Sequence, residues 1–218
     1  MNPPSLSTLS LSLEQGIAEI RLNRPDKSNA MNDAMWQEIR QAFDWVDATP
    51  EARVAILSGA GRNFCAGIDL TLLAGIQQRI AHPDAARSRE ALRRLILDLQ
   101  DCLSSVERCR KPVLAAIQGA CIGGALDLVT SCDMRYAAAD AVFSVREIDL
   151  GMVADVGTLQ RLPRQIPEGA ARELAFTGRN FRAEEGERLG LINRVFASNE
   201  ALTAAVRELA QTIAAKSP

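Results

Sequence analysis

The chain has 218 residues, a formal net charge of −2, 47% hydrophobic residues and 24% charged residues. These values are typical of one globular domain with its own core, and they exclude a disordered chain. The balanced charge provides no basic footprint for nucleic acid or for an anionic membrane surface. Because His82 is the single histidine, a multi-histidine metal site is excluded, and acid–base chemistry falls to the 27 Asp and Glu residues.

The five cysteines form no CxxC pair and are odd in number. This pattern argues against a disulfide framework or a zinc site and predicts a reducing, cytoplasmic location. The N-terminal segment has no basic region followed by a long apolar run, so it does not resemble a signal peptide. The most apolar stretch, residues 113–129, is interrupted by polar residues and glycines, and we expect no membrane span.

The first half of the chain begins with a strand pattern. Residues 16–22 alternate between apolar and polar, and a turn-rich polar loop follows them. Asn32 or Asp33 can cap a helix with one apolar face. Residues 54–57 are a short apolar strand that ends in a glycine loop.

The second half continues the alternation of helices and strands. The expected elements are a helix over 88–110, a buried strand over 113–117, an apolar helix over 125–132, a strand over 133–137 and a helix over 200–215. Residues 142–163 are irregular and indicate a functional loop. Strands that alternate with helices predict an α/β fold with parallel pairing, here as a single domain over residues 1–218.

Two glycine-containing loops are candidate binding elements. Gly123 and Gly124 stand between a buried strand and a buried helix, where free helix amides can hold a phosphate or a developing oxyanion. Equally, these glycines can serve only close packing. The loop 65–69 can offer a second free amide at Ile68, although alone it is better explained as a plain turn.

Three acids follow the Gly-Gly turn. Asp127 lies in the first helical turn, where a carboxylate complements the helix dipole. Glu147 can pair with Arg146 or cap a helix. Asp155 is an isolated charge in an apolar run, and desolvation there would raise its pKa toward the range that suits proton transfer.

Three other residues have simpler expected roles. We expect His82 to be exposed and Arg161 to be a structural ion-pair partner. Arg24 and Lys27 can meet phosphates, although two basic residues in a loop are common.

The order of these segments resembles the crotonase superfamily, also known as the enoyl-CoA hydratase/isomerase family. The resemblance extends over residues 17–196 and rests on the segments 23–32, 64–70, 116–119, 122–127 and 190–195. It implies a crotonase fold of repeated ββα units, assembled as trimers or dimers of trimers. It also implies an acyl-CoA thioester substrate, with no separate cofactor and no metal.

The resemblance implies specific site residues as well. The backbone amides of Ile68 and Gly124 would form the oxyanion hole for the thioester oxygen. The substrate and coenzyme A would contact Arg24, Lys27, Ala30, Ala66, Gly67, Asp69 and Gly123. Family members usually continue through further C-terminal helices, which this chain is expected to lack because it ends at Pro218.

Residues 145–151 and 154–163 are similar to the dienoyl-CoA isomerase branch, which converts 3,5-dienoyl-CoA to 2,4-dienoyl-CoA. Hydratases have glutamates at the positions of Asp127 and Glu147 and an uncharged loop at Asp155. Glu147 and Asp155 are therefore the candidates for proton transfer at C2 and C6, in an order left open, with Asp127 tuning or orienting them. The alternatives are an enoyl-CoA hydratase and a non-catalytic acyl-CoA-binding protein.

Overall fold

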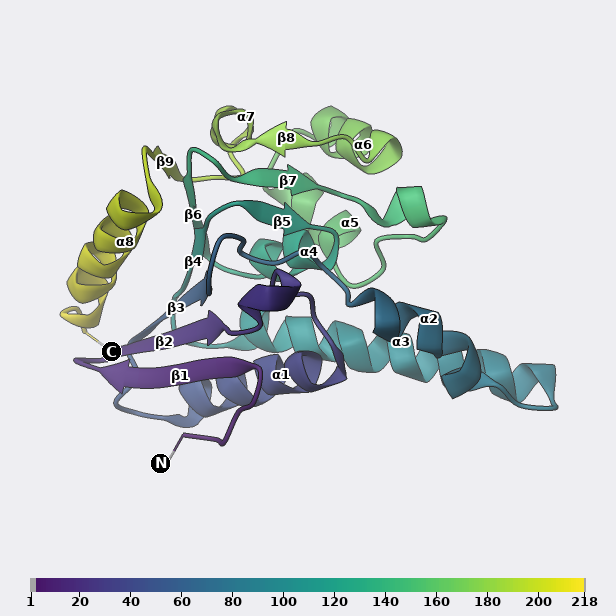
Figure 1. Cartoon of the computed structure of the whole chain (residues 1–218). Helices are drawn as coiled ribbons and strands as arrows, with labels where there is room; N and C mark the ends of the chain where they lie inside the picture. The colour runs from purple at the N-terminus through teal and green to yellow at the C-terminus, as the bar shows by residue number, and fades with distance from the viewer. Residues whose placement is uncertain (1–2, 218) are drawn as a thin grey trace.

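A computed structural model describes residues 3–217, and a six-stranded sheet runs through its centre (Figure 1). The strand order is β1 (Leu9–Glu14), β2 (Ile17–Leu22), β3 (Val54–Gly59), β4 (Val113–Ile117), β6 (Met134–Ala138) and β9 (Arg194–Phe196). β1 and β2 form an antiparallel hairpin whose two turn residues, Gln15 and Gly16, both have positive φ. The remaining pairs are all parallel, as the alternation of strands and helices predicts.

A second, three-stranded sheet lies beside the first and consists of β5 (Ala120–Ile122), β7 (Val142–Ser144) and β8 (Phe181–Arg182). β4 and β5 follow one another in the chain but belong to different sheets, as do β6 and β7. α4 (Gly124–Thr130) comes directly after β5. This ββα arrangement is that of the expected crotonase fold.

Helices cover both faces of the six-stranded sheet (Figure 1). On one face, alternate strand residues such as Val54, Ile56 and Leu114 pack against α8 (Asn199–Ala214). On the other face, residues such as Ala55 and Leu57 belong to the main core with α1 (Asp33–Ala48), α3 (Ala85–Arg108) and α4. The period of two along the strands therefore separates two cores.

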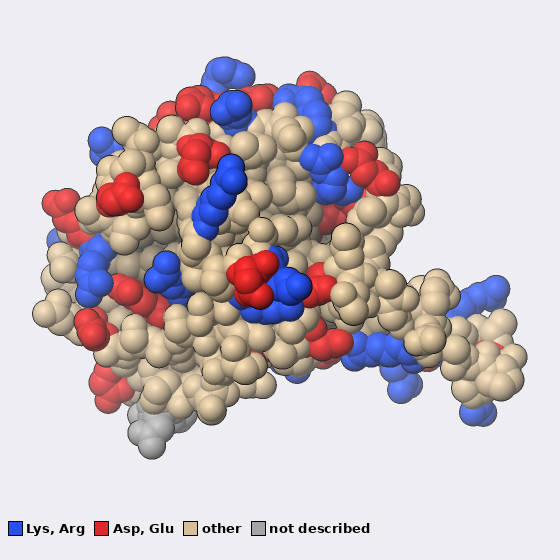
Figure 2. All heavy atoms as spheres, viewed as in Figure 1, with Lys and Arg blue, Asp and Glu red and all other residues tan. Residues whose placement is uncertain are grey.

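Most of the remaining elements lie around the second sheet, and α2 (Leu70–Ile80) lies beside α3, whose end projects to the right in Figure 1. The others are η1 (Pro25–Lys27), η2 (Glu147–Leu150), α5 (Thr158–Arg161), η3 (Leu162–Arg164), α6 (Glu168–Thr177) and α7 (Ala183–Leu189). No helix in the described part of the chain is long and apolar enough to cross a membrane. Acidic and basic side chains are interspersed over the face shown in Figure 2.

The expected strands over 16–22, 54–57, 113–117 and 133–137 are confirmed as β2, β3, β4 and β6. Asn32 is the cap of α1, because its side chain accepts a hydrogen bond from the Met35 amide at 3.0 Å. The helix expected from residue 88 begins earlier, at Ala85, since Asp84 caps it. The segment 142–163 is irregular apart from β7, η2, α5 and η3.

Candidate active site

The loop that carries Ile68 is fixed by a parallel bridge between Met31 and Ile68. The Met31 amide donates to the Gly67 carbonyl at 2.8 Å, and the Asp69 amide donates to the Met31 carbonyl at 3.0 Å. In such a bridge the N–H of the central residue points away from the partner strand. The Ile68 amide therefore faces the other side of its loop.

The two glycine loops are in direct contact. A Cβ on Gly67, whose φ is +91°, would lie 2.5 Å from the Ile122 carbonyl oxygen and 3.4 Å from the Gly124 nitrogen. Gly124 is the first residue of α4, where an amide has no partner within the helix. Within residues 3–217, neither the Ile68 amide nor the Gly124 amide donates a backbone hydrogen bond. The structure thus brings together the two loops expected to form an oxyanion hole.

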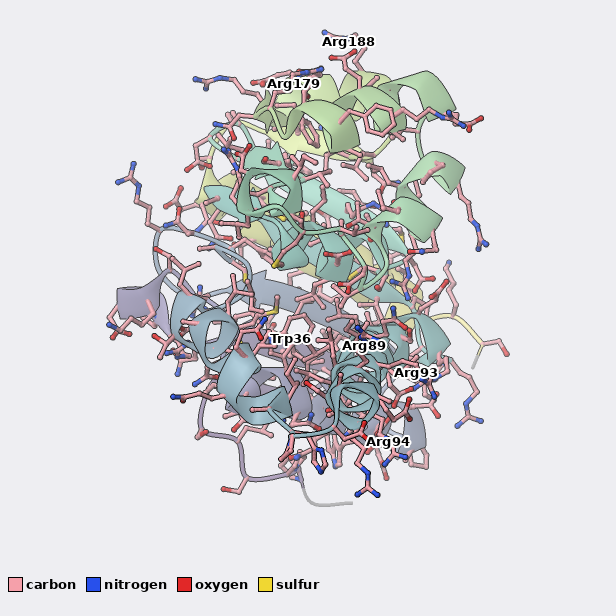
Figure 3. All side chains as sticks on the ribbon, turned by 90° about the vertical axis from the view of Figure 1, so that its right-hand side faces the viewer. Trp36, Arg89, Arg93, Arg94, Arg179 and Arg188 are labelled. Atoms are coloured by element: carbon pink, nitrogen blue, oxygen red, sulfur yellow. The ribbon has the colours of Figure 1, made fainter. Side chains whose placement is uncertain are left out.

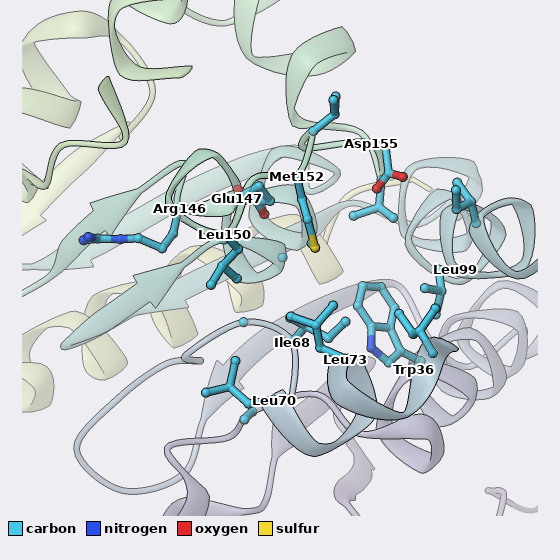
Figure 4. A pocket seen from close by; sticks show the side chains of 18 of the residues that line it. Trp36, Ile68, Leu70, Leu73, Leu99, Arg146, Glu147, Leu150, Met152 and Asp155 are labelled. Atoms are coloured by element: carbon cyan, nitrogen blue, oxygen red, sulfur yellow. The ribbon is translucent and has the colours of Figure 1, made fainter. Parts of the chain in front are cut away.

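These loops open onto a cavity of about 730 Å³ (Figure 4). The predicted substrate-binding residues Ala30, Ala66, Gly67 and Gly123 line it. Most of its other lining is apolar and comes from four elements of the fold, with Trp36 from α1, Leu73 and Ile76 from α2, Leu92, Leu95, Ile96 and Leu99 from α3, and Leu150, Met152, Val153 and Val156 from the segment after β7. Such a lining suits a hydrocarbon chain.

Glu147 lies on the wall of the cavity beside the Gly123–Gly124 turn. A Cβ on Gly123 would be 3.1 Å from Glu147 Oε1, and Glu147 Oε2 is buried without a hydrogen-bond partner among the described residues. Burial, together with the neighbouring charge of Asp127, raises the pKa of Glu147 to about 7. The interpretation of Glu147 as an ion-pair partner of Arg146 is wrong, because Arg146 pairs with Asp149 at 2.9 Å and points away from the cavity in Figure 4.

Asp155 lies farther along the same wall, toward Leu99 of α3 (Figure 4). It is half-buried, and desolvation raises its pKa above the ordinary value for an aspartate. The two carboxyl groups that face the cavity are therefore those expected to transfer protons. They share one wall, while Ile68 and Trp36 lie across the cavity from them.

Asp127 is fully buried and is not among the described residues that line the cavity. Its Oδ1 accepts a hydrogen bond from the Thr158 amide at 2.5 Å, and its Oδ2 has no partner among the described residues. Burial raises the pKa of Asp127 to about 6. Its charge raises the pKa of Glu147, as expected of a tuning residue, whereas the pKa of Asp155 is raised by desolvation.

The predicted phosphate-binding residues Arg24 and Lys27, and the predicted substrate contact Asp69, lie at a second, polar hollow of about 450 Å³. It is lined by Arg24, Lys27 and Asp69 together with Arg79, and Arg24 pairs with Asp69 at 3.0 Å. Arg24 also donates to the Ala30 carbonyl, so it connects this hollow to the cavity-lining segment.

Sequence reasoning missed three residues that shape the site. Buried Asn29 donates to the carbonyls of Ala60, Asn63 and Phe64. Trp36 packs beside Gly124 and lies inside the molecule in Figure 3, whereas Arg93 and Arg94 of α3 point outward. Gln100 of α3 donates to the Asp155 carbonyl at 2.5 Å. Spacing indicates only that Trp36 and Gln100 are helical; it does not show what they contact.

The two expected roles outside the site are confirmed. His82 is exposed, and its Nδ1 accepts a hydrogen bond from the Asp84 amide at 3.0 Å. Arg161 pairs with Glu107 at 2.7 Å. Among residues 3–217 no group of three or more His, Cys, Asp and Glu side chains is arranged to hold a metal ion.

The fold thus places two unpaired backbone amides beside an apolar cavity that two carboxyl groups face. Residues 12–218 match the family "Enoyl-CoA hydratase/isomerase". The chain belongs to this family.

Individual relatives are similar over nearly the whole chain. A peroxisomal Delta(3,5)-Delta(2,4)-dienoyl-CoA isomerase of Arabidopsis thaliana is 44% identical over 98% of this chain and 77% of its own length. A mitochondrial enzyme of the same name from Homo sapiens is 45% identical over 95% of this chain, which spans 63% of the human protein. An enoyl-CoA hydratase/isomerase structure from Xanthobacter autotrophicus Py2 superposes with a TM-score of 0.88 at 32% identity, over 98% of this chain and 76% of that one.

Proposed function

We propose that this protein is a dienoyl-CoA isomerase that converts a 3,5-dienoyl-CoA into a 2,4-dienoyl-CoA. The observation that carries the proposal is the pair of desolvated carboxyl groups, Glu147 and Asp155, on one wall of an apolar cavity beside two free amides. The names of the Arabidopsis and human relatives support the same reaction. The substrate is the acyl-CoA thioester, and coenzyme A enters as part of it.

The geometry supports a different role for each of the two acids, one at C2 and the other at C6. The thioester oxygen would bind at the amides of Ile68 and Gly124, so C1 and C2 lie next to that turn. Glu147 packs against Gly123 in the same turn and is the base at C2, whereas Asp155 lies farther along the cavity and is the acid at C6.

The proton and electron balance closes with these two groups. Glu147 takes a proton from C2, and the electron pair of that bond forms the C2=C3 double bond of the product. The C3=C4 pair moves to C4=C5, and the C5=C6 pair takes a proton from Asp155 at C6. In the intermediate, negative charge reaches the thioester oxygen, where preorganised amides stabilise it. Return of a proton from Glu147 to Asp155, directly or through solvent, resets the enzyme.

Asp127 has a supporting role in this proposal. It does not touch the acyl cavity, but its charge adds to the effect of burial in raising the pKa of Glu147 to near neutrality, where a general base is effective. A hydratase needs a second carboxylate in the cavity near C2 and C3 to handle water. In this chain the corresponding carboxylate faces the Thr158 amide instead.

The deciding experiment offers the purified protein a 3,5-dienoyl-CoA and, separately, a 2-enoyl-CoA. We expect isomerisation of the diene and little hydration. The absorbance of the conjugated 2,4-dienoyl thioester measures the isomerisation. Asp155→Asn should lower the isomerisation rate by about 10²- to 10⁴-fold while thioester affinity stays nearly unchanged. Hydration without isomerisation would contradict the proposal, as would full activity in Asp155→Asn.

Two further expectations accompany this function and stay predictions. One is assembly as a homotrimer or a dimer of trimers. The other is a cytoplasmic location, which the cysteine pattern indicates.

A further inference from the structure

The segment that carries Asp155 has almost no backbone support of its own. Between the end of η2 and the start of α5 the chain follows no regular helix or strand. No backbone–backbone hydrogen bond involves residues 153–156 within the part of the chain that the structure describes. The position of a proton-transfer group therefore depends on side chains that reach this segment from elsewhere.

Two side chains bind this segment, and a third binds the start of α5 directly after it. Gln100 Nε2 donates to the Asp155 carbonyl at 2.5 Å, and Arg161 Nη1 donates to the Val156 carbonyl at 3.3 Å. Asp127 Oδ1 accepts from the Thr158 amide at 2.5 Å. Of these contacts, the bond from Gln100 is the one made to Asp155 itself.

Gln100 belongs to a polar row on α3. Gln100, Ser104 and Glu107 follow one another at helical spacing, and Ser104 and Glu107 both bind the guanidinium of Arg161. The adjacent row of the same helix contains Leu92, Leu95, Ile96 and Leu99, which line the acyl cavity. α3 thus forms one wall of the acyl cavity and also holds the segment that carries Asp155.

We infer that Gln100 is a positioning residue for Asp155, and that it acts on proton transfer at C6 without touching the substrate. This inference rests on the proposed function and deepens it. Gln100 is not among the described residues that line the cavity, so its loss would not alter the contacts of the acyl chain directly. A displacement of about 1 Å at a reacting group lowers a rate by roughly 10²-fold.

The variant Gln100→Met keeps the length of the side chain and removes the amide N–H. We expect kcat for diene isomerisation to fall by about 10- to 100-fold, with KM within about twofold of wild type. Exchange of the C2 hydrogen for solvent deuterium requires Glu147 but not Asp155. That exchange should therefore proceed in Gln100→Met at a rate close to that of wild type.

A matched control is Gln211→Met, since Gln211 is exposed on α8 at the far face of the sheet. Its kinetics should equal those of wild type. Asp155→Asn should reproduce the split between retained exchange and lost isomerisation, and Glu147→Gln should abolish both. The melting temperature of Gln100→Met should fall by only about 2–4 °C, as expected for one lost hydrogen bond.

A kcat of Gln100→Met equal to that of wild type would overturn the inference. Equal losses of exchange and isomerisation would also overturn it, because they would indicate general damage to the site that affects proton transfer at both C2 and C6. These outcomes leave the proposed function intact. Absence of isomerisation in the wild-type protein would instead overturn the proposed function, and this inference with it.

Discussion

The two sides of the cavity are built in opposite ways. The oxyanion side uses backbone amides in loops that β-bridges fix, with Met31 paired to Ile68 and Cys65 paired to Cys121. The acid side uses the carboxyl groups of Glu147, in η2, and Asp155, and residues 153–156 around Asp155 make no backbone–backbone hydrogen bond within the described chain. Backbone bridges hold the first side, whereas on the second side the segment of Asp155 is held by side chains from elsewhere, such as Gln100.

This difference separates two tasks of the site. An oxyanion hole needs two donors at a fixed spacing, and backbone held by neighbouring loops provides it without reorganisation. Proton transfer along a diene needs groups with tuned pKa values at two carbons, and burial of side chains provides that. We expect changes on the two sides to damage different quantities.

The largest effect is expected for Glu147→Gln. This change removes the proposed base at C2 and should lower kcat by about 10³- to 10⁴-fold, with a small change in KM. Steady-state kinetics on a 3,5-dienoyl-CoA measure it, and Glu208→Gln on the exposed face of α8 is the matched control. A loss of less than tenfold would show that Glu147 is not the base.

The next largest effect is expected on the oxyanion side. In Gly67→Ala the added Cβ would lie 2.5 Å from the Ile122 carbonyl oxygen at a φ of +91°, so the two loops must separate. We expect kcat to fall by about 10²- to 10³-fold. The strained backbone should lower the free energy of unfolding by roughly 1–3 kcal/mol, measured by chemical denaturation.

Gly169→Ala is the control for that change, because a Cβ on Gly169 in α6 meets no atom within 4 Å. It should alter neither activity nor stability by much. If Gly67→Ala were as active as this control, contact between the two loops would not be needed for catalysis.

Asp127→Asn tests whether the charge of buried Asp127 raises the pKa of Glu147. Glu147 must be ionised to act as a base, so activity falls as the pH drops through its pKa of about 7. Removal of the Asp127 charge lowers that pKa, and the acidic limb of the kcat/KM profile, which reports groups of the free enzyme, should move to lower pH. The pH–rate profile measures this shift, and exposed Asp140→Asn should leave it in place.

The same variant has a stability signature. The pKa of Asp127 is raised from 3.8 to about 6 in the folded protein, so the native state binds the proton more tightly than the unfolded chain. Wild-type stability is therefore lost as the pH rises between about 4 and 6, on the order of 1–3 kcal/mol. Asp127→Asn should remove this loss. An unchanged pH dependence of the free energy of unfolding would contradict a buried, raised-pKa Asp127.

The two sides also differed in how well the sequence predicted them. The Gly123–Gly124 turn and the 65–69 loop are local motifs that the sequence marks, but their contact was expected only from the resemblance to the enoyl-CoA hydratase/isomerase family. The anchors of the acid side, such as Gln100, were missed because they lie on elements far from Asp155 in the sequence. No local pattern marks such a contact.

The same distinction holds for the elements of the fold. Buried strands such as β4 have continuous apolar runs and were found at their observed bounds. α2 was missed because most of its apolar residues are only partly buried, so that Ile80 alone in this helix is buried and Leu70 is 66% exposed. β1 was missed although leucines alternate with serines in it, the same period of two that indicates β2, whereas the short strands β5, β8 and β9 are defined by tertiary pairing.

The smallest effect is expected where binding alone is changed. Lys27 is exposed at the polar hollow beside Arg24, where it can meet a phosphate of coenzyme A. Lys27→Gln should raise KM by about two- to fivefold, the value of an exposed ion pair, and leave kcat unchanged. The difference in KM should shrink as the salt concentration increases, because exposed charges are screened.

Lys111→Gln, at the opposite end of β4 from the site, is the control. A fall in kcat rather than a rise in KM would contradict the separation of binding from proton transfer, since it would mean that this loop helps to set the geometry of the reacting groups.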